Sequence, residues 1–124
     1  MREIKFRVYC KFRKQMVTVG VDSNASFNHD GTISTHGVLG SNPLMQYIGL
    51  NDKSGKEIYE GDIVRHKFKR IWHTQEHTSK VVWNEFYCCY YLFDGVSNHR
   101  MRDDIQYEVI GNIYENPGLL SQSI

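Results

Sequence analysis

The chain has 124 residues and a formal net charge of +1, which fits one domain with a hydrophobic core and no strong overall attraction to nucleic acid or membrane. Aromatic residues make up 13% of the chain, which argues against disorder. Since no apolar run approaches about 18 residues and the first residues are charged, we expect a cytoplasmic protein.

The three cysteines, Cys10, Cys88 and Cys89, predict reduced thiols. Their number is odd, and two neighbouring cysteines on a strand would point to opposite faces of it. A disulfide framework is therefore not expected, and a reduced thiol can pack as a small apolar side chain.

Residues 4–10 predict a half-buried strand, because Ile4, Phe6 and Val8 alternate with more polar side chains. Residues 15–21 can return beside this strand after a short turn, which would make an N-terminal hairpin.

Residues 22–43 predict a loop. They are rich in Asn, Ser, Gly and His, which favours a loop or a poorly ordered excursion. Within this stretch, residues 28–31 favour a hairpin turn before a brief strand at 32–35.

The stretch GLNDKSGKE at 49–57 resembles a phosphate-binding loop but fails the requirements of one. A loop of the G-x-x-x-x-G-K-[ST] type ends in a hydroxyl residue that helps to bind magnesium. Here five residues separate Gly49 from Gly55, and Glu57 stands where the hydroxyl residue should be. We predict a hairpin turn in which Gly55 takes a positive φ, and we expect no cofactor.

Residues 61–72 predict a strand that starts at the turn Gly61-Asp62, with Asp62 accepting a nearby backbone N–H. One face of this strand is apolar and the other is cationic. Cations with interleaved aromatic rings are typical of single-stranded nucleic-acid binding. The candidate nucleic-acid-binding residues are Arg65, Lys67, Lys69, Arg70 and Trp72.

Residues 74–80 are polar, and we predict a loop there. The spacing of His73, Glu76 and His77 resembles a zinc-protease motif, but that motif requires a long helix and a further ligand. We therefore interpret these histidines as exposed loop residues and expect no metal site.

Residues 81–94, VVWNEFYCCYYLFD, carry aromatic side chains on both faces, as a strand that is covered on both sides would, with a possible break into a hairpin at Asn84-Glu85. One of these faces needs a cover, which either the N-terminal hairpin or a second copy of the chain can provide. We predict a homo-oligomer, because tyrosine suits an interface. The candidate self-association residues are Tyr87, Tyr91 and Phe93.

Residues 105–114 predict the last strand, and Pro117 ends it because proline cannot donate to a ladder. The adjacent acids Asp103 and Asp104 would diverge rather than share a cleft. Since no catalytic motif has its required context, we expect no enzyme activity. The many short strands, without a convincing helical period, predict a mainly β, barrel-like domain, and an α+β fold with one short helix is the alternative.

Three blocks together resemble the YopX family of phage and prophage proteins. The blocks are REIKFRVYCKFRKQMV at 2–17, LMQYIGLNDKSGKEIYEGDIV at 44–64 and YEVIGNIYENPGLL at 107–120. The first block departs from the family pattern, because Val8-Tyr9-Cys10 stands where an aromatic–acid pair is common after Phe-Arg.

This resemblance implies a single YopX-like domain over 1–124, with an N-terminal β segment at 1–50 and a barrel-like core at 58–116. The core would be an SH3-like β-barrel that begins near residues 60–64 and follows an N-terminal β-hairpin or meander. Self-association and a temperate-phage context, in the cytoplasm of the bacterial host, are implied as well. The resemblance supplies no biochemical activity.

The leading hypothesis is a non-enzymatic phage accessory protein that binds a host or phage protein. It depends on the absence of a convergent catalytic set in the sequence and on the many aromatic residues at strand positions. The alternative is a small nucleic-acid-binding β-barrel protein that uses the basic strand face.

Overall fold

The computed structural model describes residues 4–11, 14–19, 25–27, 33–35, 38–39, 44–69, 72, 74–96, 98–102 and 105–120. These residues form twelve strands and one short 3-10 helix, which confirms the prediction of a mainly β fold. The chain divides into two compact units, Met1–Tyr47 and Ile48–Ile124, which are described in turn. That the two units make one domain remains a prediction.

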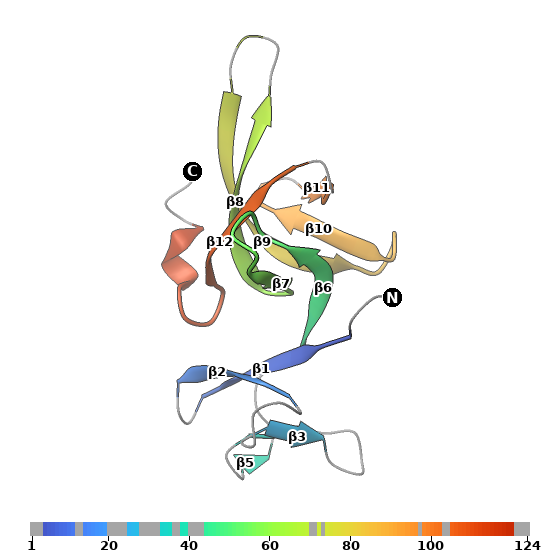
Figure 1. Ribbon diagram of the computed structural model, residues 1–124, viewed down its shortest axis with the longest axis vertical. Coiled ribbons are helices and arrows are strands. Elements are labelled where there is room, and N and C mark those ends of the chain that lie inside the picture. The colour runs from blue at the N-terminus through green and yellow to red at the C-terminus, as the bar shows by residue number, and fades with distance from the viewer. Residues whose placement is uncertain are drawn as a thin grey trace. The chain divides into compact units, whose positions relative to one another are not determined.

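The first unit contains the predicted N-terminal hairpin. Strand β1 (Phe6–Cys10) lies between β2 (Gln15–Thr18) and the start of β6 (Met45–Asn51), and both pairings are antiparallel (Figure 1). Val8 pairs with Val17 across the hairpin, and both side chains are buried in a small apolar cluster. The alternation of apolar and polar residues thus predicted the hairpin correctly.

The predicted buried face of β1 is partly wrong. Ile4 is 69% exposed, because the strand begins only at Phe6. Arg7 and Cys10 are buried together with Val8. Burial along β1 therefore does not follow strict alternation.

The predicted loop at 22–43 contains a three-stranded sheet instead. Strands β3 (Ala25–Phe27), β4 (Ile33–Thr35) and β5 (Val38–Leu39) pair antiparallel in that order. The brief strand predicted at 32–35 is therefore confirmed as β4, and the predicted hairpin turn at 28–31 lies outside the described residues. The polar composition of this stretch indicated a loop, but strands can pair through backbone hydrogen bonds without an apolar face.

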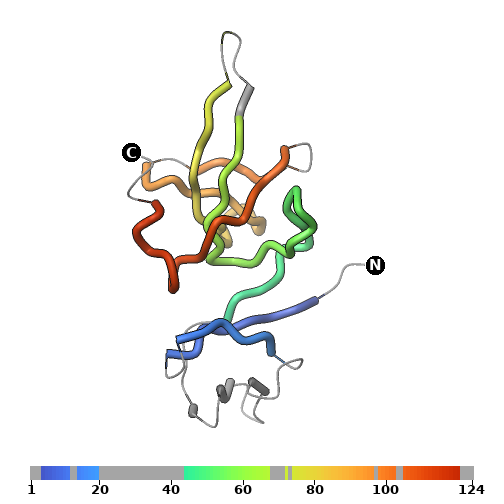
Figure 2. The backbone as a smooth tube through the Cα atoms, turned by 60° about the vertical axis from the view of Figure 1, so that its left-hand side comes forward, coloured from blue at the N-terminus to red at the C-terminus, as the bar shows by residue number. Residues whose placement is uncertain are grey.

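The second unit is built on an open five-stranded sheet that curls into a half-barrel (Figures 1 and 2). The strand order is β11-β10-β9-β8-β12, and all the pairings are antiparallel. The strands are β8 (Asp62–Lys69), β9 (Thr74–Asn84), β10 (Cys89–Phe93), β11 (Asn98–Arg100) and β12 (Tyr107–Asn112). Their inner face buries a core cluster formed by Ile48, Ile58, Val64, Val81, Leu92 and Tyr107.

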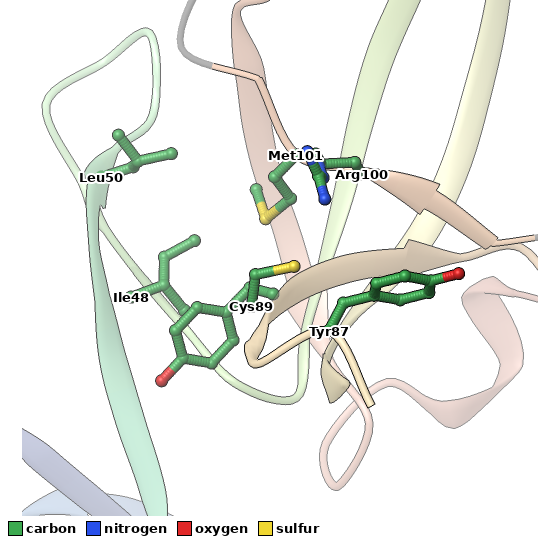
Figure 3. Close-up of a pocket in the computed structure, with 7 residues that line it drawn as sticks. Ile48, Leu50, Tyr87, Cys89, Arg100 and Met101 are labelled. Carbon is green, nitrogen blue, oxygen red and sulfur yellow. The ribbon is translucent and has the colours of Figure 1, made fainter. Parts of the chain in front are cut away.

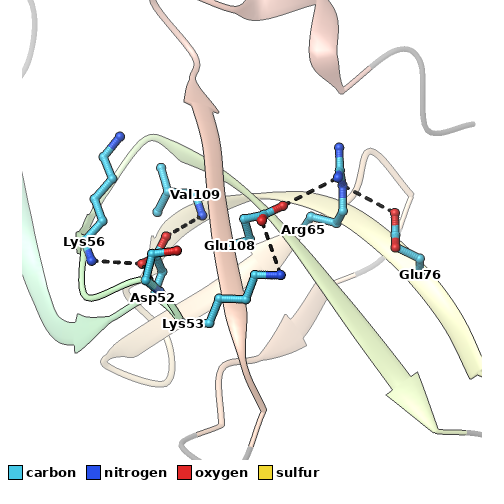
Figure 4. Close-up of polar contacts among 8 residues, drawn as sticks. Asp52, Lys53, Lys56, Arg65, Glu76, Glu108 and Val109 are labelled. Carbon is cyan, nitrogen blue, oxygen red and sulfur yellow. Dashed lines mark hydrogen bonds and ion pairs between the residues drawn. The ribbon is translucent and has the colours of Figure 1, made fainter.

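A polar turn joins β6 to β7 (Glu57–Tyr59), as predicted from the GLNDKSGKE stretch (Figure 4). Gly55 has a φ of 88°, a conformation that favours glycine. The Asp52 carboxylate accepts backbone N–H groups from Ser54 and Lys56 at 2.9 Å each, and from Val109 on β12 at 3.0 Å. This one carboxylate therefore shapes the turn and connects it by a hydrogen bond to β12.

The predicted turn before β8 is also confirmed. Gly61 has a φ of 82°, and Asp62 accepts the backbone N–H of Tyr59 at 2.8 Å. Asp62 is only 1% exposed, so this hydrogen bond satisfies a buried carboxylate and a buried donor together.

A third polar turn follows β12. The Asn112 side-chain oxygen accepts the backbone N–H groups of Tyr114 and Glu115, at 3.0 Å and 2.9 Å. Gly111 lies so close to Asn116 that a Cβ atom there would come within 2.5 Å of the Asn116 side chain. The strand predicted at 105–114 thus ends at Asn112, in this turn and not at Pro117, and a 3-10 helix follows at Pro117–Leu119.

The predicted loop at 74–80 is wrong, because these residues are the first part of β9. They pair with β8 from Lys69↔Thr74 to Ile63↔Lys80. Pairing of β8 with β12 ends at His66, and pairing of β9 with β10 ends at Lys80. The outer part of the β8–β9 hairpin therefore extends beyond its neighbours as a two-stranded arm (Figures 1 and 2).

Candidate functional site

The stretch 81–94 folds as a hairpin with its turn at Glu85–Cys88, which confirms the predicted break at Asn84-Glu85. Asn84 shapes the turn, since its side-chain oxygen accepts the backbone N–H of Tyr87 at 2.9 Å. Cys88 closes it with a φ of 53°, an uncommon conformation for a residue with a side chain. The prediction that Tyr87 lies on a strand face is therefore wrong, because Tyr87 lies in the turn.

Five aromatic side chains lie at this end of the hairpin, in two contacting groups that include the oppositely directed neighbours Tyr90 and Tyr91. We call them the aromatic end: Trp83, Phe86, Tyr87, Tyr90 and Tyr91. Trp83 meets Tyr90 edge to face with the ring centroids 4.9 Å apart, and Tyr87 stacks on Tyr91 at 5.9 Å. Phe86 is 84% exposed, Tyr87 57% and Trp83 45%. Exposed large apolar groups that cluster in this way are typical of interaction surfaces.

A pocket of about 410 Å³ adjoins the aromatic end (Figure 3). Its lining residues are Ile48, Leu50, Tyr87, Cys89, Tyr90, Arg100 and Met101. Ile48 and Leu50 face the pocket from β6, while the Met101 side chain points toward Cys89 on the other side. Leu50, Tyr90 and Met101 also pack against the core, so the wall is held by the half-barrel itself.

Arg100, at the end of β11, is the one charged residue of this lining. Among the residues that the structure describes, no carboxylate forms an ion pair with it. Arg65 differs, because its guanidinium lies 3.3 Å from Glu76 and 3.5 Å from Glu108 (Figure 4). The pocket thus combines an apolar and aromatic wall with a guanidinium group that can form an ion pair with an acidic side chain.

The predicted nucleic-acid-binding residues fall into two groups. Arg65 is engaged with two glutamates on neighbouring strands. Lys67 is exposed on the β8–β9 arm, and Trp72, between the two strands of this arm, is 91% exposed. The Lys69 side chain and Arg70 lie outside the described part of the chain.

The structure also separates the predicted self-association residues. Tyr87 and Tyr91 stack on each other at the aromatic end. Phe93 lies at the far end of β10, where the Lys80 ammonium group lies 5.6 Å from the centre of its ring. Only the two tyrosines therefore belong to the exposed aromatic surface.

Sequence reasoning missed a histidine cluster on the half-barrel. His66 is 2% exposed, stacks on His77 with the ring centroids 5.7 Å apart and lies 3.4 Å from the Ser79 hydroxyl. His99 lies 6.0 Å from His77, and its imidazole is 3.7 Å from the Asp94 carboxylate. Alternation of His77, Ser79 and Val81 in the sequence could have indicated a strand with one buried face.

Of the three histidines in this cluster, only His66 is buried. The pKa of His66 is lowered to about 4, first by burial and then by the neighbouring His77 and His99, while Asp94 opposes the shift. Within the described ranges, no group of three or more His, Cys, Asp or Glu side chains has an arrangement that could hold a metal ion. His66 is therefore uncharged at neutral pH.

Comparison with known proteins supports the fold and identifies the family. The chain is similar to the crystal structure of protein EF1440 from Enterococcus faecalis, with a TM-score of 0.58 and 24% identity over 97% of this chain and 99% of that one. At this identity the likeness shows the fold alone. A comparison with curated proteins gives no match.

Along the described residues, no helix has the length and hydrophobicity that crossing a membrane would require.

The sequence model of the family described as YopX protein matches residues 5–121. This match covers nearly all of the 124 residues, and the chain therefore belongs to the YopX family.

Proposed function

We propose that this YopX family member is a non-enzymatic phage accessory protein that binds a host or phage protein in the bacterial cytoplasm. Membership of the family fits a phage-type protein. The observation that carries the proposal is the aromatic end, where Phe86 is 84% exposed beside Tyr87 and Trp83. Tyrosine, tryptophan and arginine are enriched in protein interfaces, and here such residues surround a pocket.

The size of the aromatic end fits a binding surface that needs the pocket as well. Covering the exposed parts of Trp83, Phe86 and Tyr87 would remove on the order of 400 Å² from water, which contributes about 10 kcal/mol before other terms. Association costs a similar amount in lost translational and rotational freedom. A stable complex therefore requires further contacts, and the adjoining pocket with Arg100 can provide them.

Two buried acids, Asp52 and Asp62, have a structural role. Burial alone would raise the pKa of Asp52, but hydrogen bonds from Val109, Lys56 and Ser54 outweigh it and lower this pKa. Asp62 accepts a backbone N–H inside a buried turn. Both carboxylates are thus committed to holding turns, and neither lines the pocket.

A capture experiment tests the proposal. The tagged protein is exposed to lysate from phage-infected host cells, and bound proteins are compared between wild type and the variants Phe86→Ser and Val96→Ser. Val96 is 82% exposed after β10 and does not line the pocket, so it is a matched control for losing an exposed apolar side chain. We expect Phe86→Ser to lose most of the captured partner and Val96→Ser to keep it. Equal capture by all three proteins would contradict the proposal.

Nucleic-acid binding through the β8–β9 arm is the second candidate, favoured by the exposure of Trp72 at 91% and of Lys67. An exposed ring beside cations can stack on an unpaired base. Against it, the net charge is +1 and Arg65 is already paired with two glutamates. A gel-shift assay with single-stranded DNA and RNA at increasing salt tests it, because binding by counterion release must weaken steeply as the salt concentration rises. Loss of the shift in Trp72→Ala would assign the binding to the arm.

A further inference from the structure

The charge of the pocket indicates which protein segments fit it. Six of the seven lining residues are uncharged, and the seventh is Arg100. A pocket with a single cation and no lining acid repels a basic segment and attracts an acidic one. The volume of about 410 Å³ is at the lower end of the range for ligand pockets, so it suits one large side chain rather than an extended cofactor.

The lining also indicates how such a segment would be held. Ile48, Leu50 and Met101 offer apolar surface, and the rings of Tyr87 and Tyr90 add flat aromatic contacts. An apolar side chain that enters the pocket loses its contact with water on several sides, as an anchor residue at a protein interface does. The Arg100 guanidinium can then form paired hydrogen bonds with a carboxylate close to that anchor.

The position of Arg100 favours a segment in extended conformation. Arg100 ends β11, which is the last strand of the five-stranded sheet. An edge strand can pair with an added strand, and neighbouring side chains of the added strand would then alternate between the sheet and its surroundings. A carboxylate one or two positions from the anchor would lie within reach of an arginine side chain at this edge.

We propose that the pocket takes a large apolar side chain from an extended segment of a partner protein, and that Arg100 pairs with an Asp or Glu close to this anchor in the segment. This inference rests on the proposed function, because it names the chemistry of the partner at the same surface. It predicts that the partner carries an acidic residue within two positions of a Leu, Phe or similar side chain.

An array of short synthetic peptides tests the inference. Each peptide has a central Leu or Phe with a Glu or Asp nearby, and each has a matched peptide with Gln or Asn in place of the acid. Affinities are measured by fluorescence anisotropy. We expect the acidic peptides to bind about fivefold more tightly than their amide matches, the size of a partly exposed ion pair. Arg100→Leu should remove this preference, and Arg65→Leu should keep it, since Arg65 does not line the pocket.

Alkylation of Cys89 locates the bound peptide. In Cys88→Ser, the described thiols that remain are Cys89, which lines the pocket, and Cys10, which is buried at 1% exposure. Bound acidic peptide should slow alkylation of Cys89 at least severalfold and leave Cys10 unchanged. Equal affinity of acidic and amide peptides across the array, or unchanged alkylation of Cys89 at saturating peptide, would overturn the inference.

The capture experiment separates failure of this inference from failure of the proposed function. If Phe86→Ser loses the captured partner while Arg100→Leu keeps it, protein binding at the aromatic end stands and the acidic segment is wrong. If neither variant changes capture, the proposed function falls together with the inference. Loss of capture in both variants supports both.

Discussion

Two regions of the second unit use their side chains in opposite ways. In the turns, Asp52, Asp62 and Asn112 direct polar groups onto backbone N–H groups, and all three side chains are buried. At the aromatic end, Phe86 and Tyr87 direct large rings toward solvent. The turns satisfy donors that would otherwise be buried without a partner, whereas the exposed rings gain little from folding.

We therefore expect the stability of the half-barrel to depend on the turns, and the proposed partner binding to depend on the aromatic end. A substitution in the turns should lower the free energy of unfolding and affect binding only through the folded fraction. A substitution at the aromatic end should weaken binding directly and change the free energy of unfolding little.

Asp52→Ala should lower the free energy of unfolding by about 3 kcal/mol, because it removes a charged acceptor from three backbone N–H groups. Urea denaturation followed by tryptophan fluorescence measures this change. Asp52→Asn keeps one acceptor oxygen and should lose less, so it separates the hydrogen bonds from the mere loss of volume. A loss below about 1 kcal/mol in Asp52→Ala would show that the turn does not depend on this carboxylate.

Acid should destabilise the half-barrel through His66. The pKa of this histidine is about 4 in the folded protein and 6.5 as the ordinary value, so the unfolded chain binds the proton more readily. Stability is therefore complete above pH 6.5 and is lost as the pH falls toward 4, by on the order of 3 kcal/mol. Urea denaturation at a series of pH values measures the slope.

The groups around His66 define the control for this pH dependence. His77 and Ser79 face it from β9, Tyr107 from β12, and His99 with Asp94 lies beyond His77. His66→Phe keeps a ring of similar size and should flatten the slope between pH 6.5 and 4. A slope that is the same in wild type and His66→Phe would assign acid sensitivity to other groups.

Gly111→Ala should cost about 1–2 kcal/mol, because the added Cβ would come within 2.5 Å of the Asn116 side chain. Asn116 must move to relieve the contact, and its hydrogen bond to the Asn112 backbone N–H, 3.3 Å long, would then be lost. Gly118→Ala is the matched control, since a Cβ there meets no atom within 4 Å. Thermal unfolding of the two variants compares them, and equal melting temperatures would show that the turn adapts without cost.

The polar turns could be predicted from the sequence because their causes are local. Gly55 follows Asp52 by three residues, and Gly61 stands next to Asp62. The residues that form each turn are therefore close together in the sequence. The first part of β9 was missed for the opposite reason. Its polar composition favoured a loop, and pairing with β8, which is distant information for any local motif, makes it a strand.

The candidate site could be predicted in composition but not in geometry. The aromatic residues of 81–94 are visible in the sequence, yet the positive φ of Cys88 moves Tyr87 off the strand and into the turn. The pocket needs Ile48 from β6 and Arg100 from β11 beside β10. Such a meeting depends on strand register across the sheet, which no local motif encodes.

The smallest effect on stability is expected at the stacked pair Tyr87 and Tyr91, where the largest effect on association is expected. The rings stack at 5.9 Å with an angle of 7° between their planes, and Tyr87 is 57% exposed. A second copy of the chain could cover this flat surface, and the tyrosine hydroxyls would remain at the wet rim. We predict that the wild type forms a homo-oligomer through this pair.

Tyr87→Asp or Tyr91→Asp should convert the oligomer to a folded monomer, because a carboxylate buried between two apolar surfaces without a partner is costly. Light scattering measures the mass. Urea denaturation at a protein concentration low enough to dissociate the oligomer should show a change in the free energy of unfolding of about 0.5 kcal/mol or less for the exposed Tyr87. Phe93→Asp is the contrasting variant, since Phe93 lies under Lys80 at the far end of β10, and it should leave the oligomer intact. A wild-type mass near the 14.5 kDa of one chain at micromolar concentration would refute self-association outright. Binding of a host or phage protein at the aromatic end would then not require a second copy of the chain to dissociate first.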